Sequence, residues 1–260
     1  MRAGLLPLLT AAFAAAAEAQ TLEARFLSEF RRLGPDGEII AQDAAGKPRE
    51  IISPAIIRNG YTSFHIVLNG PAGKDFMLYI ASNPDRVLRP VVYRVTGPDR
   101  LEAVKTLSVA GKFNEHGAAV FWLDIWTPAA TPVRRIRLEA QLNVGEDFVI
   151  TPLELRVQAG VVPPGALPTV PVKPGGNSGS GPFALLGRAL CGIPGVTPAG
   201  TGDGLSILAK IMRNAGQDIL LARGAGAGTK LSEWCAARRD DANPESYLRL
   251  RDSIWRANQQ

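Results

Sequence analysis

The chain has 260 residues, of which 46% are hydrophobic, 20% charged and 7% aromatic, and its formal net charge is +5. This composition excludes a disordered, collagen-like, coiled-coil or disulfide-dense protein and suits one or two folded domains with a hydrophobic core. Residues 20–160 hold 17 Lys and Arg against 16 Asp and Glu, so basic charge is not concentrated in a patch. Nucleic acid is therefore not expected as a partner.

The N-terminus has the order of features of a secretory signal peptide. Met1-Arg2 is followed by an uncharged, mostly apolar run from Leu5 to Ala17 and by the small residues of Ala17-Glu18-Ala19. This pattern predicts export and cleavage after Ala19, with an uncleaved membrane anchor as the alternative. The apolar run is shorter than the roughly 20 residues that span a bilayer. We expect a periplasmic or extracellular protein without a transmembrane segment in the mature chain.

Residues 20–160 predict an antiparallel β-sandwich. Apolar and polar side chains alternate in several runs that Gly, Pro, Asn and Asp turn signals separate, at a spacing of about 10 to 15 residues. The apolar rows are Phe64, Ile66 and Leu68; Phe76, Leu78 and Ile80; Ile136, Leu138, Ala140 and Leu142; and Leu153, Leu155 and Val157. Each row is expected to face a core between two sheets.

The beginning of this region is open to two interpretations. Gly34-Pro-Asp-Gly37 suits a hairpin turn, because Pro fixes φ at the first central position and Gly37 can take a left-handed conformation. Such a hairpin would pair residues 26–33 with residues 38–42. A helix is the alternative, because it would suit the spacing of Leu22, Phe26, Phe30 and Leu33.

One stretch carries a family resemblance. Residues 121–142 read Phe-Trp-Leu-Asp-Ile-Trp-Thr-Pro-Ala-Ala-Thr-Pro-Val-Arg-Arg-Ile-Arg-Leu-Glu-Ala-Gln-Leu. This pattern resembles the late strands of bacterial immunoglobulin-like modules, where an apolar strand ends in a Pro-containing turn and a long alternating strand follows. The resemblance extends over residues 45–158 and lacks the Cys pair of antibody domains. It implies an Ig-like sandwich and an adhesive, spacer or docking role.

A Pro/Gly-rich segment, residues 161–181, is expected to link the sandwich to a second body at 182–260. It contains five Pro and five Gly, and its proline-rich part should be extended and semi-rigid. The second body predicts short helices over residues 183–191, 204–214, 217–223 and 230–239. Asn243-Pro244-Glu245 predicts a fifth, with a capping residue, Pro at the first position and an acid in the first turn.

Cys191 and Cys235 are the only cysteines, and both lie in this helical region. Because a small helical domain has a marginal core and the export signal predicts an oxidising compartment, we expect a structural disulfide between them. The loop-entropy model assigns such a bridge about 4 kcal/mol.

The motifs that could carry chemistry are weak. Ser178 in Gly-Asn-Ser-Gly-Ser-Gly-Pro resembles the nucleophile loop of chymotrypsin-like proteases, but His65 and His116 both lack the sequence context of a catalytic base. Gly224-Ala-Gly-Ala-Gly-Thr-Lys230 lacks phosphate-loop spacing. Two separated His and one cystine do not provide a zinc or copper ligand set, so no cofactor is expected; a calcium site in the loops stays open.

The most informative binding signal is a row of aromatic side chains around an acid. Phe121, Leu123 and Ile125 alternate with Trp122, Asp124 and Trp126 along one strand. If the first row is core, the second could form an exposed platform for sugar rings or a docking surface for a protein. The alternative is that the Trp row is itself buried. Arg135, Arg137 and Arg156 share another outward face with Glu139 and Glu154, which favours a mixed, solvated surface.

Together these observations predict an exported, non-enzymatic interaction or structural protein of the cell envelope, with a protein or another envelope component as partner. A carbohydrate-binding module using Trp122 and Trp126 is one alternative. An enzyme of unrecognised type, with a cleft near His65 or His116, is the other.

Overall fold

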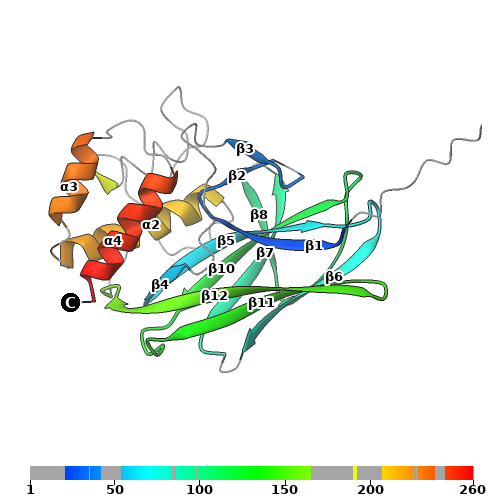
Figure 1. Cartoon of the computed structure of the whole chain (residues 1–260), viewed down its shortest axis with the longest axis horizontal. Coiled ribbons are helices and arrows are strands. Elements are labelled where there is room, and N and C mark those ends of the chain that lie inside the picture. The colour runs from blue at the N-terminus through cyan, green and yellow to red at the C-terminus, as the bar shows by residue number, and fades with distance from the viewer. Residues whose placement is uncertain are drawn as a thin grey trace, which may run out of the picture.

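The computed structural model describes residues 21–34, 36–41, 54–83, 86–97, 99–164, 190–191, 207–224, 226, 228–237 and 244–259. The predicted signal peptide, the linker beyond residue 164 and the predicted helix before residue 190 lie outside these ranges. The described chain is mostly β-sheet with a C-terminal helical region (Figure 1).

The strands form two five-stranded sheets and one small hairpin. Sheet I has the order β1 (Glu23–Ser28), β5 (Gly60–Asn69), β10 (Ala118–Thr127), β7 (Arg89–Gly97) and β8 (Arg100–Val104). Sheet II has the order β4 (Ala55–Arg58), β12 (Asp147–Val161), β11 (Arg135–Val144), β6 (Asp75–Asn83) and β9 (Ser108–Lys112). Strand β4 runs parallel to β12, whereas the other neighbours in the sheets are antiparallel.

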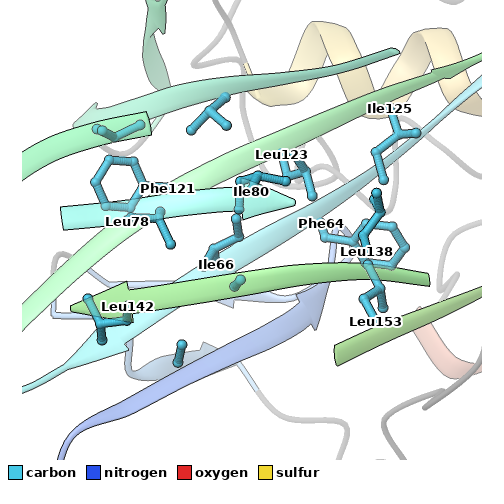
Figure 2. Packing of buried hydrophobic residues seen from close by; sticks show 14 of the residues in the cluster. Phe64, Ile66, Leu78, Ile80, Phe121, Leu123, Ile125, Leu138, Leu142 and Leu153 are labelled. Atoms are coloured by element: carbon cyan, nitrogen blue, oxygen red, sulfur yellow. The ribbon is translucent and has the colours of Figure 1, made fainter. Parts of the chain in front are cut away.

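The two sheets contribute to one hydrophobic core. All four predicted apolar rows are buried in it, together with Phe121, Leu123 and Ile125 of β10 (Figure 2). Because side chains alternate between the two faces of a strand, burial of these rows directs the intervening residues to the outer faces of the sheets. The alternation in the sequence therefore predicted the core correctly.

The N-terminal arm differs from both sequence interpretations. Its first part, β1, lies beside β5 in sheet I, with Phe26 opposite Ile66. Only β2 (Arg32–Leu33) and β3 (Ile39–Ala41) pair with each other. Gly37 takes the expected left-handed conformation with a φ of 75°. The turn was thus predicted, but the strand before it, β1, pairs with β5 at the edge of sheet I.

The helical region contains α2 (Ile207–Gly224), α3 (Gly228–Ala237) and α4 (Pro244–Ala257). The sequence predicted two helices, 204–214 and 217–223, where the structure has the single helix α2. Gly216, which separates the two predicted helices, lies in the buried middle of α2. Packing against the strands outweighs the roughly 1 kcal/mol that an interior Gly costs a helix.

The helices pack on the strands. One hydrophobic cluster joins Trp122 and Tyr93 of sheet I to Ile211 and Ala215 of α2. Another joins Ile57 of strand β4 to residues of α2 and α4. Strand β12 continues one residue past the predicted boundary at 160, and the following Val162 is buried in that second cluster.

The disulfide prediction is confirmed. Cys191 and Cys235 are bonded, with their Cα atoms 5.4 Å apart. The bridge ties the short segment at residue 191 to α3, whose residues are exposed or only partly buried. A helix with so little buried surface depends on such a covalent tie.

Candidate functional site

The outer face of sheet I carries the residues that the sequence singled out, and it is covered by α2. Trp122 has 0% of its surface exposed and Asp124 has 3%. Trp126 is partly buried and its ring centroid lies 4.8 Å from that of Tyr61. The expectation of an exposed Trp platform is therefore corrected: α2 occupies this face, and the buried alternative describes Trp122 and Asp124.

Asp124 is the centre of a polar cluster that holds α2 on the sheet. Its carboxylate accepts hydrogen bonds from Lys210 Nζ at 3.1 Å and from Arg213 Nη1 and Nη2 at 3.0 and 2.6 Å. Ser63 of neighbouring β5 donates a further hydrogen bond to Asp124 Oδ1 at 2.6 Å. The two cations also lie over tyrosine rings, Lys210 over Tyr93 and Arg213 over Tyr61. Each helix cation is thus held by both a carboxylate and an aromatic ring.

A second polar cluster holds α4. Arg251 Nη1 donates to Glu29 Oε1 at 2.6 Å, and Arg251 Nε lies 3.8 Å from Asp218 Oδ1 of α2. The hydroxyl of Tyr247 and the indole Nε1 of Trp255 donate to the Asp218 carboxylate. Asn214 connects this cluster to the first, because its amide donates to Glu29 and to Ser63. The sheet, α2 and α4 are therefore joined by one buried network.

The charges in this network balance. The acids Glu29, Asp124 and Asp218 and the bases Lys210, Arg213 and Arg251 are each no more than 5% exposed. Burial would raise the pKa of Asp124, but Arg213, with Lys210 and Ser63, more than offsets that effect and lowers it. For Glu29 and Asp218, burial dominates and raises the pKa, although Arg251 opposes the shift. Asp124 is thus the carboxylate that the network keeps most firmly ionised.

His65 lies under the helices, on the same face of sheet I. It is 3% exposed, and its ring packs edge-on against Trp122 at a centroid distance of 4.9 Å. Neither ring nitrogen makes a hydrogen bond of normal geometry. Burial lowers its pKa to about 4, although backbone groups of Arg31 and Glu29 oppose part of the shift. His65 is therefore neutral at physiological pH.

His116 occupies a different environment, in the turn before β10. Its side chain is 61% exposed and lies 3.7 Å from Asp36 and 3.5 Å from Glu115. The candidate nucleophile Ser178 lies outside the described residues. Among the described residues, no group of three or more His, Cys, Asp or Glu side chains has the arrangement of a metal site.

One small cleft opens beside the second polar cluster. It has a volume of about 40 Å³, and Glu29, Thr62, Arg251 and Trp255 are among its lining residues. A buried water needs about 10–15 Å³ of such space, so the cleft has room for a few waters and not for a sugar ring.

The outer face of sheet II, in contrast, carries a group of exposed apolar side chains. Met77 and Tyr79 of β6 and Phe148 and Ile150 of β12 are 41%, 40%, 68% and 44% exposed. We call these four residues the Phe148 patch. Strand register places Met77, Asn143 and Phe148 side by side in one row, and Tyr79, Gln141 and Ile150 in the next. Sequence analysis missed the patch, although apolar residues on both faces of residues 148–150 are visible in the sequence.

Charged residues surround the patch at both ends of sheet II. At one end, Arg135 pairs with Glu154 at 2.9 Å and Arg137 with Glu139 at 2.8 Å. The predicted mixed charged surface is therefore present there. At the other end are two exposed acids, Glu146 in the turn between β11 and β12 and Asp147 at the start of β12.

No protein-family model and no curated protein matches the chain. Among solved structures, a family 123 glycoside hydrolase from Clostridium perfringens is 12% identical with a TM-score of 0.38, over 55% of this chain and 28% of that one. SSP-19, an MSP-domain-like protein of Caenorhabditis elegans, is 9% identical with a TM-score of 0.25, over 40% of this chain and 94% of that one. PapD-like domain 7 of human CEP192 is 12% identical with a TM-score of 0.25, over 46% and 94%. These likenesses are too low to assign a function. In the described residues, no helix is both long and apolar enough to cross a bilayer.

Proposed function

We propose that the protein is an exported, non-enzymatic interaction module that docks on a protein partner through the Phe148 patch. The two sheets act as an Ig-like β-sandwich that presents sheet II. The observation that carries this proposal is the exposure of four large apolar side chains in two adjacent rows of one sheet face. Phe, Tyr and Met are enriched in protein interfaces, and contiguous apolar surface on a soluble protein marks an interaction site.

The buried face of sheet I supports the same conclusion by a different route. Trp122 and Asp124 are buried, so the carbohydrate-binding alternative has no exposed Trp pair to use. The network around Asp124 fixes the helices on sheet I, while sheet II remains accessible. The Cys191–Cys235 bond suits an oxidising compartment, which is where the N-terminal targeting pattern would send the chain.

Site-specific photo-crosslinking in intact cells tests this function. A benzophenone amino acid at position 148 is expected to give adducts with a partner, because Phe148 is the most exposed of the four patch residues, at 68%. The matched control is Val91 of β7, which is also apolar and 40% exposed but belongs to sheet I. The proposal fails if position 148 gives no adduct, or gives no more than position 91.

A further inference from the structure

We propose that the cleft between α3 and α4 binds a phosphorylated ligand through its phosphate groups. This inference goes beyond the docking function, because the cleft and the Phe148 patch lie on different elements. The cleft is open to solvent and has a volume of about 460 Å³. The described residues that line it are Lys230 of α3 and Arg249, Asp252, Ser253, Arg256 and Ala257 of α4.

Helix α4 has one side for the core and another for the cleft. Tyr247, Leu250 and Ile254 are no more than 6% exposed and pack in clusters with strand residues and α2. Three further cleft residues lie three, four and seven positions after Arg249, and residues at this spacing share one side of a helix. Arg249 and Arg256 are exposed. The helix is therefore held in place by one side and presents two guanidinium groups on the other.

Helix α3 brings a third cation to the cleft. None of its residues is buried, although Leu231 and Trp234 pack partly against the cluster that contains α4 residues. The disulfide of Cys235 restrains the same helix. Lys230 lies at its beginning, and Lys230 Nζ donates a hydrogen bond to Ser253 Oγ at 3.5 Å. A helix with so little buried surface adds little to the core, but it holds an ammonium group beside the basic side of α4.

The charge of the cleft matches that of a phosphate group. Its described lining has three cations, Lys230, Arg249 and Arg256, against one acid, Asp252, which gives a net charge of +2. A phosphate monoester carries a charge of about −1.5 to −2 at pH 7 and has strong acceptor oxygens. A guanidinium group donates two parallel hydrogen bonds to such oxygens, and an ammonium group adds a point charge. The Ser253 hydroxyl is a further donor.

The lining also limits what the rest of the ligand can be. Small-molecule sites typically have volumes of about 300–1,000 Å³, so the cleft has room for more than one phosphate group. Among the described lining residues, none is aromatic and Ala257 is the single apolar one. A nucleobase would find no stacking partner among these side chains, and an acyl chain would find little apolar surface. The expected ligand is therefore a small, polar phosphate ester or an oligophosphate.

Asp252 distinguishes a phosphate site from a structural group of surface charges. Its Oδ2 lies 3.5 Å from Arg256 Nη2, and its side chain is 24% exposed. In a structural group, removal of this acid would break a weak ion pair and do nothing else. In a phosphate site, the same change removes a negative charge that repels the ligand. Asp252→Asn should therefore tighten phosphate binding by about threefold.

Isothermal titration of the full chain with pyrophosphate, at constant ionic strength, measures the affinity. The wild type should bind with a dissociation constant below about 1 mM. Lys230→Gln and Arg256→Gln should each weaken binding by about fivefold, because each removes a charge contact at a solvent-exposed site. The matched control is Lys112→Gln, which changes an exposed lysine of β9 in sheet II and should bind like the wild type. Urea unfolding of each variant checks that the fold is retained.

Vesicle flotation distinguishes a soluble phosphate from the phosphate of a lipid headgroup. A headgroup site predicts that the wild type floats with vesicles of phosphatidylglycerol but not of phosphatidylcholine, and that Lys230→Gln no longer floats. A site for a soluble ligand predicts pyrophosphate binding without flotation. The inference is overturned if the wild type binds neither probe, if Lys230→Gln and Arg256→Gln bind as tightly as Lys112→Gln, or if Asp252→Asn fails to tighten binding. These outcomes are independent of crosslinking at position 148.

Discussion

In soluble proteins, the polar face of a sheet is usually exposed and the apolar face buried. The outer faces of the two sheets show the reverse. Sheet I presents Ser63, His65 and Asp124, and this polar face is buried. Sheet II presents Met77 and Phe148, and this apolar face is exposed. Strand alternation decides which side chains share a face, but it does not decide whether that face meets water or protein. A polar face becomes buried when a helix with matching charges is available to cover it.

The buried charges on the outer face of sheet I contribute more to the specific placement of α2 than to net stability. Moving charges out of water carries a penalty of several kcal/mol per ion, which a buried pair offsets only through close geometry and additional hydrogen bonds. Asp124 meets this condition, with a two-point contact to Arg213 and further hydrogen bonds from Lys210 and Ser63. Removing one partner should therefore cost far more than the net stability that the cluster provides.

Replacing Asp124 makes the largest expected difference between the two faces. Asp124→Asn should lower the free energy of unfolding by about 3–5 kcal/mol, because it leaves Lys210 and Arg213 buried without their counter-ion. The control is Glu154→Gln on sheet II, which alters an exposed pair with Arg135 and should cost less than about 1 kcal/mol. Urea denaturation measures both, and equal losses would show that the buried network has no special role.

Removal of the disulfide should act on the helices alone. The double variant Cys191→Ser, Cys235→Ser is expected to lose about 4 kcal/mol in the loop-entropy model, for a sequence separation of 44 residues. Amide hydrogen exchange should accelerate in α3 and stay unchanged in β11, since the bridge constrains only the helical region. Reducing agent should have the same effect on the wild type and none on the double variant. Faster exchange in β11 would contradict this assignment.

The burial of His65 should make stability depend on pH. Its folded pKa of about 4 lies below the ordinary value of 6.5, so between these values the unfolded chain binds a proton that the folded chain does not. Stability is therefore lost as pH falls from 6.5 to 4, by about 3 kcal/mol, and this contribution changes little below pH 4. His65→Leu should remove this part of the slope in urea titrations at several pH values.

Two buried acids also contribute to the pH dependence of stability, in the wild type and in His65→Leu alike. The raised pKa values of Glu29 and Asp218 act in the opposite direction in every variant, so the difference between wild type and His65→Leu isolates His65. Parallel slopes in those two proteins would count against a buried neutral His65.

The close approach of α2 to β5 gives the smallest expected effect. A Cβ at Gly60 would lie 2.7 Å from both Gln217 Oε1 and Ile57 Cγ2. Gly60→Ala should therefore cost about 1–3 kcal/mol through overpacking. Gly228→Ala places its Cβ in open space at the start of α3, and it should be neutral or gain up to about 1 kcal/mol. Thermal unfolding of the two variants compares them, and equal shifts would argue against tight docking of α2.

The amino-acid sequence by itself determined the core and the covalent tie. Alternation is a local property with a period of two residues, so Phe64, Leu78 and Leu138 could be assigned to the core from their neighbours alone. The two cysteines permitted a single intrachain pairing, and Asn243-Pro244 marked the start of α4 through local capping chemistry. The core rows and the helix start depend on interactions within a few residues, and two cysteines allow only one intrachain pairing.

Only the tertiary structure decided which face is open. Asp124 meets Arg213 across 89 positions of the chain, and neither residue lies in a pattern that predicts the other. Whether Trp122 is exposed depends on the position of α2. Charge pairs and aromatic contacts between distant segments determine that position. The exposure of Phe148 is likewise not determined by the alternation along β12, which decides only the face on which its side chain lies.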